Sequence, residues 1–151
     1  MNALKAYQTL SRWPLGRWIF SWATTWTAPY FATIRPLVAD LNATGCTVRF
    51  RKRRRVQNHL GTVHAIAMCN ACELSFGLTM EAGLSRSLRW IPKAMTARYL
   101  KKATTDLEAI CSFPELPELT AGDHPVYVKV VDKKGEVVMD ATITVYVSPR
   151  K

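Results

Sequence analysis

The stretch of sequence that decides the fold begins Asn58-His59-Leu60-Gly61-Thr62-Val63-His64 and continues, with few polar residues, from Ala65 to Leu84. A helix over residues 65–84 is apolar on nearly every side, because its polar side chains are only Asn70, Glu73, Ser75, Thr79 and Glu81. A helix with that pattern is buried in the core of a domain. The stretch therefore predicts a long central core helix.

Glu73 lies in the middle of this predicted helix, where a charged carboxylate is unusual. Glu is rarely fully buried unless it is paired or used in chemistry. The helical neighbours of Glu73 at three and four residues are Cys69, Asn70, Phe76 and Gly77, and desolvation on such a surface makes a carboxylate a stronger base. Glu73 is therefore a candidate general base. The alternative is a Glu near the helix rim that snorkels into solvent or pairs with an Arg.

The residues before the helix suggest a site at its N-terminus. Gly61 lets the backbone approach another group closely, and Thr62 is a suitable N-cap. The free amides of the first turn then stabilise a developing negative charge, such as that on a polarised carbonyl oxygen, or a bound phosphate. Asn58 and His64 flank this end. The alternatives are that Asn58 simply holds a turn and that His64 is an ordinary hydrogen-bonding residue.

Together these residues resemble the hotdog-fold thioesterases. In that superfamily an Asn, a Gly and a His precede the central helix, and an Asp or Glu follows nine residues after the His, as Glu73 follows His64 here. Among the enzyme branches, the pattern resembles the phenylacetic-acid-pathway type. The segment Arg54–Ala65 resembles more closely an uncharacterised hotdog family of acyl-CoA thioesterase-like proteins. The resemblance covers roughly residue 30 to the C-terminus.

The resemblance implies an α+β hotdog fold, in which an antiparallel sheet wraps around the long central helix, and a homodimer or homotetramer. It implies an acyl-CoA thioesterase in which Glu73 activates water or attacks the thioester and Asn58 orients the water or substrate. The backbone amide around Ala65 polarises the carbonyl. The site lies between subunits, with Asn58 and His64 approaching the partner subunit's Glu73. This chemistry requires no metal and no cofactor.

One departure from the enzyme branch concerns the start of the helix. The enzymes usually have Gly-Gly after the His, whereas this chain has Ala65-Ile66. The added bulk narrows the approach of a substrate to the helix N-terminus. The alternative function is therefore a non-catalytic acyl-CoA or lipid-binding hotdog protein.

The net charge of +10 indicates an anionic partner. Six of the seven residues from Arg49 to Arg55 are basic. This segment, or Lys101 and Lys102, is a candidate to bind the phosphates of coenzyme A. Anionic lipid, nucleic acid or mere solvation of the segment are the alternatives, although no motif for reading or stacking bases accompanies it.

The four cysteines include a Cys69-Asn70-Ala71-Cys72 spacing. A redox CxxC normally lies at the start of a helix, where the helix dipole lowers the pKa of the thiol, but this one falls well inside. No second pair supplies the spacing of a zinc site. We interpret both as small core residues, and free thiols are typical of a cytoplasmic protein.

Residues 1–29 are predicted to form a helical extension of a hotdog domain over residues 30–151. A helical stripe consists of Leu15, Trp18, Ile19, Trp22 and Trp26. The first interpretation is a surface helix that packs this stripe on the domain or on a second subunit. The second is a helix that makes peripheral contact with a membrane, because Lys5, Arg12 and Arg17 accompany the Trp residues.

The remaining patterns predict antiparallel strands. Alternation of apolar residues over Val126–Val130 and Met139–Val147, with a turn at Asp132–Gly135, indicates a hairpin with one buried face. Further strands are predicted at Leu37–Leu41, Cys46–Phe50, Ile91–Ala103 and Thr105–Phe113, with a loop from Pro114 to Gly122.

Overall fold

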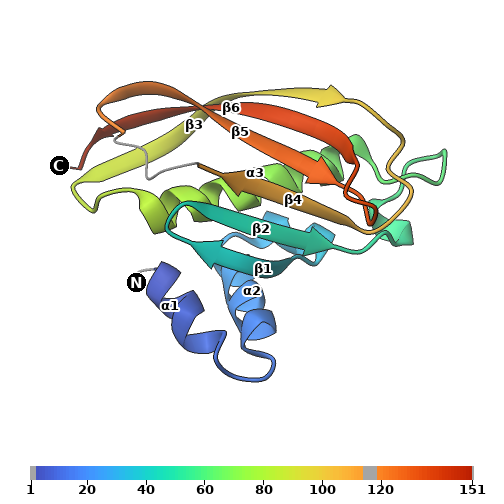
Figure 1. Ribbon diagram of the computed structural model, residues 1–151, viewed down its shortest axis with the longest axis horizontal. Helices are drawn as coiled ribbons and strands as arrows, with labels where there is room; N and C mark the ends of the chain where they lie inside the picture. The colour runs from blue at the N-terminus through green and yellow to red at the C-terminus, as the bar shows by residue number, and fades with distance from the viewer. Residues whose placement is uncertain (1–2, 114–118, 151) are drawn as a thin grey trace.

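The computed structural model describes residues 3–113 and 119–150 (Figure 1). Its helices and strands, in chain order, are α1 (Ala3–Leu10), α2 (Gly16–Thr27), η1 (Pro29–Ile34), β1 (Leu37–Asn42), β2 (Gly45–Phe50), η2 (Arg54–Val56), α3 (Ala65–Gly83), β3 (Leu88–Tyr99), β4 (Leu107–Ser112), β5 (Gly122–Val131) and β6 (Val137–Pro149). The predicted loop that begins at Pro114 falls largely on residues 114–118, outside the described residues.

The six strands form one antiparallel sheet in the order β1-β2-β4-β5-β6-β3. The sheet curves over the long helix α3, with α1 and α2 below it beside β1 (Figure 1). This is an α+β hotdog fold, as the sequence predicts. Strands β1 and β3 are the two edges of the sheet.

Helix α3 is the core helix that the sequence predicts. Ten of its residues are buried: Met68, Asn70, Ala71, Cys72, Leu74, Ser75, Phe76, Leu78, Thr79 and Met80. Ser75 and Thr79 satisfy their hydroxyls by donating to the carbonyls of Cys72 and Ser75 one turn earlier. A helix can therefore bury these two polar side chains without an unpaired donor.

The predicted hairpin is confirmed as β5 and β6. Val126, Val128 and Val130 are buried, whereas Tyr127 and Lys129 are exposed on the other face. The turn closes through the Gly135 amide, which donates to the Asp132 carbonyl at 3.0 Å. Alternation with one buried face fixes the register, because a slip of one residue would turn the valines to solvent.

The strand predicted over Ile91–Ala103 is displaced. Strand β3 starts at Leu88 and ends at Tyr99. The amides of Leu100 and Lys101 both donate to the Val138 carbonyl, so the regular ladder with β6 ends there. The strand predicted over Thr105–Phe113 is confirmed in the shorter form of β4, Leu107–Ser112.

The N-terminal helices pack on the domain, but not through the predicted stripe. Tyr7 of α1 and Phe20 of α2 lie edge to face at 5.2 Å and join a cluster with Val38 and Leu74. The Tyr7 hydroxyl donates to the Ala39 carbonyl at 2.9 Å. By contrast Leu15, Trp18, Ile19, Trp22 and Trp26 are all exposed. The expectation that this stripe packs on its own domain is therefore wrong.

A small buried face lets α2 lie close to the sheet. The Ser21 hydroxyl accepts a hydrogen bond from the Val38 amide of β1 at 2.8 Å. Gly16 approaches the end of α1 so closely that an added Cβ would lie 1.6 Å from the Leu10 carbonyl oxygen. Among the described helices, none is long and apolar enough to cross a membrane.

Candidate functional site

The turn before α3 is organised by Asn58. Its side-chain oxygen accepts the amides of Leu60 at 3.0 Å and Thr62 at 3.2 Å, and its Nδ2 donates to the Thr62 hydroxyl at 2.9 Å. Gly61, with φ +72°, takes the left-handed conformation that the turn requires. Asn58 therefore acts first as the residue that shapes this turn, next to the start of the helix.

His64, not Thr62, is the N-cap of α3. Its Nδ1 accepts the Ile66 amide at 3.1 Å, and its carbonyl accepts the amides of Ala67 and Met68. The prediction for Thr62 is wrong because the Thr62 hydroxyl is bonded to Asn58, two residues before the cap. Within the described residues the Ala65 amide makes no hydrogen bond. It is the donor left open at the positive end of the helix.

Lys101 and Lys102 are brought to the same region. The Val63 amide donates to the Ala103 carbonyl at 2.8 Å, which joins the turn before α3 to the segment that follows β3. Both Lys side chains are exposed. Lys101 pairs with Glu136 at 3.2 Å. The segment that carries these two lysines is therefore held against the turn that precedes the helix N-terminus.

Glu73 is exposed, which differs from the desolvated position expected from the sequence. It is the one exposed residue in the run 67–80, and among the described residues it makes no hydrogen bond and no ion pair. Glu81, two turns later, has its carboxylate bound by Trp90 Nε1 at 2.9 Å. The two carboxylates of α3 thus differ: Glu81 has a partner in its own chain, and Glu73 is left open.

Asn70 lies beside Glu73, three residues earlier on the helix. It is buried, and its Nδ2 donates to the Thr33 hydroxyl at 3.1 Å. Its Oδ1 has no hydrogen-bond partner among the described residues. An unpaired buried acceptor costs about 1–3 kcal/mol. Asn70 Oδ1 is therefore a buried acceptor left open one turn before Glu73.

Glu73 and the helix N-terminus of one chain are too far apart to act on one bond. Eight residues separate Ala65 from Glu73, and a helix rises about 1.5 Å per residue, so they lie roughly 12 Å apart along the axis. One thioester cannot contact both.

The Cys69-Cys72 pair does not form a redox site at a helix start. Cys72 is fully buried, and burial raises the pKa of its thiol. Cys69 is half-buried, with its sulfur 3.6 Å from the Tyr99 hydroxyl. Both are free thiols. Within residues 3–113 and 119–150, no group of three or more His, Cys, Asp or Glu side chains is placed to hold a metal ion.

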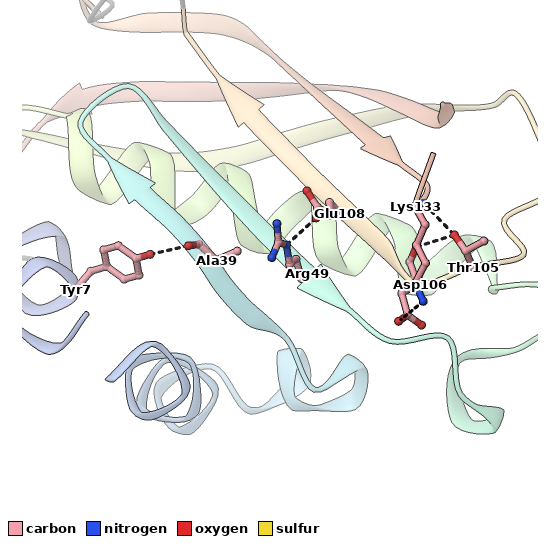
Figure 2. A network of polar contacts seen from close by, with 7 residues as sticks. All are labelled: Tyr7, Ala39, Arg49, Thr105, Asp106, Glu108 and Lys133. Carbon is pink, nitrogen blue, oxygen red and sulfur yellow. Dashed lines mark hydrogen bonds and ion pairs between the residues drawn. The ribbon is translucent and has the colours of Figure 1, made fainter. Parts of the chain in front are cut away.

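A second feature is a basic cavity of about 830 Å³ at the ends of β2 and β4. Its cationic lining residues are Arg35, Arg49, Arg51, Arg53 and Lys133. Figure 2 shows two of them paired, Arg49 with Glu108 at 2.6 Å and Lys133 with Asp106 at 3.3 Å.

The sequence indicates only part of this cavity. The basic run from Arg49 to Arg55 supplies three of its cations, but Trp18, Arg35 and Lys133 come from separate elements. Only the pairing of β2 with β4, and the packing of α2 on β1, brings them together. No spacing in the sequence could have predicted that grouping.

Comparison with known families shows which family this chain matches. A family described as a domain of unknown function, DUF4442, matches residues 16–147. A structural genomics protein of known crystal structure is 38% identical, with a TM-score of 0.87, and the match covers 98% of this chain and 99% of that one. None of the curated proteins matches this sequence.

More distant structures share the fold. A Pseudomonas aeruginosa protein of unknown function, called a probable thioesterase, is 18% identical with a TM-score of 0.77, covering 84% of this chain and 91% of that chain. A Haemophilus influenzae thioesterase is 10% identical with a TM-score of 0.69, covering 80% of this chain and 82% of the other. At these identities the likeness shows that the hotdog fold is shared with thioesterases.

Proposed function

This chain belongs to the DUF4442 family, and we propose that it hydrolyses the thioester of an acyl-CoA to a free acid and coenzyme A. The observation that carries the proposal is the open carboxylate of Glu73, the one exposed residue in the run 67–80 of α3, whereas the other carboxylate of the helix, Glu81, is bound by Trp90. The charged side chain of Glu73 has no partner in its own chain, and the N-terminal amide of the same helix is also open. Both groups are therefore free to contact a reactant. The fold shared with thioesterases supports the same chemistry.

The proposed reaction needs only groups of this chain and water. Glu73 takes a proton from a water molecule, whose oxygen attacks the thioester carbonyl carbon. The Ala65 amide and the positive end of α3 stabilise the resulting oxyanion. The C–S bond then breaks with its electron pair on sulfur, and the proton held by Glu73 passes to the departing thiolate of coenzyme A.

Other residues position the reactants. Asn58 shapes the turn that presents the Ala65 amide. Since Nδ1 of His64 accepts the Ile66 amide, the neutral ring carries its proton on Nε2, which can donate to the substrate. Lys101 and Lys102, together with Arg54 and Arg55 of η2, are proposed to bind the phosphates of coenzyme A.

We further propose that two copies form the site. Because the two groups of one chain lie roughly 12 Å apart along the helix, the helix N-terminus of one copy would face the partner's Glu73. Edge strand β3 offers a route to such a dimer, since its twelve residues have β6 as their only neighbouring strand. A bulge between Pro92 and Ala94 interrupts its first half, which leaves Ala94–Tyr99 as the regular edge.

One observation favours the alternative of an acyl-CoA or lipid-binding protein without activity. Ile66 is 54% exposed at the start of α3, at a position where the enzyme branch that the sequence resembles usually has glycine. A branched side chain there narrows the approach to the Ala65 amide. Hydrolysis assays with a panel of acyl-CoA esters separate the two functions, since the alternative expects binding without turnover of any ester.

The test of the mechanism is Glu73→Gln, with Glu81→Gln as the matched control on the same helix. Loss of a general base costs at least about a hundredfold in turnover, so Glu73→Gln should lower kcat by that factor. Glu81→Gln should leave kcat near wild type, because Glu81 is bound by Trp90. Wild-type turnover in a folded Glu73→Gln protein would reject Glu73 as the base.

A further inference from the structure

Helix α2 presents a row of aromatic and apolar side chains to solvent. Trp18, Trp22 and Trp26 lie four residues apart and are 50%, 61% and 71% exposed. The rings of Trp22 and Trp26 contact each other edge to face at 5.6 Å. Leu15 and Ile19 extend the same row. We call these five residues the tryptophan face.

The tryptophan face is not the packing face of its helix. Phe20 and Ser21 are buried against the domain, whereas the larger apolar residues of this face remain at least half exposed. Exposed apolar patches of this kind mark sites of protein or membrane contact. Trp is the residue enriched where a membrane meets water, because its ring is apolar and its N–H is polar.

The basic cavity adjoins the tryptophan face, since Trp18 belongs to both. Among the described residues, Arg35, Arg51 and Arg53 make no ion pair, although Arg53 donates to the Thr33 carbonyl at 3.0 Å. Burial, together with the charges of Arg35 and Arg55, lowers the pKa of Arg53. Like charges are thus held together at this place without enough carboxylates to balance them.

We propose that the tryptophan face and the basic cavity dock this protein on a membrane of anionic phospholipids. Trp22 and Trp26 enter the boundary between headgroups and acyl chains, and the cavity binds a headgroup phosphate through Arg35, Arg51 and Arg53. An interfacial helix with tryptophans on one face and nearby cations binds lipid in this way. The proposal goes beyond thioester hydrolysis and does not depend on it.

Charge and position argue against a second copy as the occupant of this surface. Helix α2 packs on β1, which is the edge of the sheet opposite β3. A dimer through β3 therefore leaves the tryptophan face uncovered. A symmetric contact through the tryptophan face would bring two copies of the basic cavity together, in a chain whose net charge is already +10.

Co-sedimentation of the full-length protein tests the proposal with two kinds of vesicle. One is phosphatidylcholine alone, and the other contains phosphatidylserine as well. The protein should sediment with the second. The double variant Arg35→Asn/Arg51→Gln should bind about thirtyfold more weakly, because each cation near an anionic surface contributes about a factor of five. Asn is chosen at position 35 because φ is +47° there.

The matched control for charge is Arg86→Gln/Lys129→Gln, which removes two exposed cations outside the cavity. It should bind the anionic vesicles nearly as wild type does. For the tryptophan face, Trp22→Ser/Trp26→Ser should weaken binding by about tenfold or more. Tyr127→Ser removes an equally exposed aromatic residue from the sheet and should change little.

Tryptophan fluorescence decides whether the rings enter the lipid. Four of the five tryptophans lie within residues 13–26, so Trp90→Phe leaves only the N-terminal ones as reporters. Lipids brominated on the acyl chains should quench this emission. Unquenched emission from vesicle-bound protein would overturn the proposal, as would equal binding by the variants and their controls. A smaller oligomer of Trp22→Ser/Trp26→Ser by light scattering would assign this face to a second copy instead.

Discussion

The four cysteines differ in their solvent accessibility. Cys46, Cys72 and Cys111 are buried, whereas Cys69 is half-buried. Burial raises the pKa of the thiols of Cys46 and Cys72 and raises the pKa of Cys111 to about 11. A buried thiol with a raised pKa is neither accessible nor ionised at neutral pH.

We therefore expect one reactive thiol in the native protein. A maleimide should modify Cys69 alone under native conditions and all four cysteines after unfolding, as counted by mass spectrometry. Cys69→Ser should abolish the native reaction. Labelling of Cys72 in the folded protein, or a Cys69–Cys72 disulfide on mild oxidation, would contradict the assignment of this pair to the helix core.

At the level of single residues, the sequence predicts which residues are candidates for the site better than it predicts how buried they are. The nine-residue spacing from His64 to Glu73 singles out both residues, and the structure places one at the cap and the other on the helix. The apolar neighbours of Glu73 predict a buried carboxylate, yet Glu73 is exposed in the single chain. Sequence neighbours on a helix do not show which side the sheet covers.

The N-cap of α3 is a second residue whose surroundings the sequence does not predict. Thr62 and His64 can both accept a hydrogen bond from a first-turn amide, and propensity favours Thr. The choice falls to His64 because Asn58 already holds Thr62 through its side-chain amide. That competition depends on the shape of a turn, which residue preferences do not contain.

Among the elements, α2 shows that periodicity predicts where a helix forms but not which of its faces packs on the domain. The four-residue spacing of the tryptophans correctly predicts a helix near residues 15–26. It also predicts that the tryptophans pack on the domain or on a second subunit, and packing on the domain is wrong. The hydrogen bond from the Val38 amide to Ser21, and the fit of Phe20 against Tyr7, set the opposite orientation.

Two substitutions on α2 test this orientation. Phe20→Ala should lower the free energy of unfolding by about 3–5 kcal/mol, because a buried aromatic ring is lost from a cluster. Trp26→Ala should change it by no more than about 0.5 kcal/mol, since that ring lies in solvent. Urea unfolding in the absence of lipid measures both. A larger loss for Trp26→Ala would mean that another part of the protein covers the tryptophan face.

The strands are better predicted than the helix faces, because an alternating apolar pattern also shows which side of the strand is buried. In β5 and β6 the alternating apolar residues determine both the element and the buried face. The ends of β3 are less well predicted, since they depend on where the ladder with β6 stops.

At the scale of the whole molecule, the two sheet edges have different roles. Edge β1 is covered by α1 and α2, and α2 exposes the tryptophan face to solvent. Edge β3 remains open beside the face of α3 that carries Glu73. This division lets one edge serve the proposed dimer while the opposite edge stays free for the proposed membrane contact.

Mixing two inactive variants tests whether the proposed site is shared between subunits. In Asn58→Ala the turn that presents the Ala65 amide is disturbed, and in Glu73→Gln the base is lost, so each homodimer should be inactive. A symmetric dimer has two equivalent sites. A heterodimer of the two variants should therefore carry one site with both defects and one that is intact.

An equal mixture of the two variants, unfolded and refolded together, should recover about a quarter of wild-type activity, because about half of the dimers are mixed and each has one intact site. Each variant refolded alone is the control for recovery of structure. If one chain supplied both Asn58 and Glu73 to the same site, every site in the mixture would carry a defect, and no activity would return. Such a result, with light scattering showing that dimers had formed, would place the whole site within one chain despite the roughly 12 Å between its two groups.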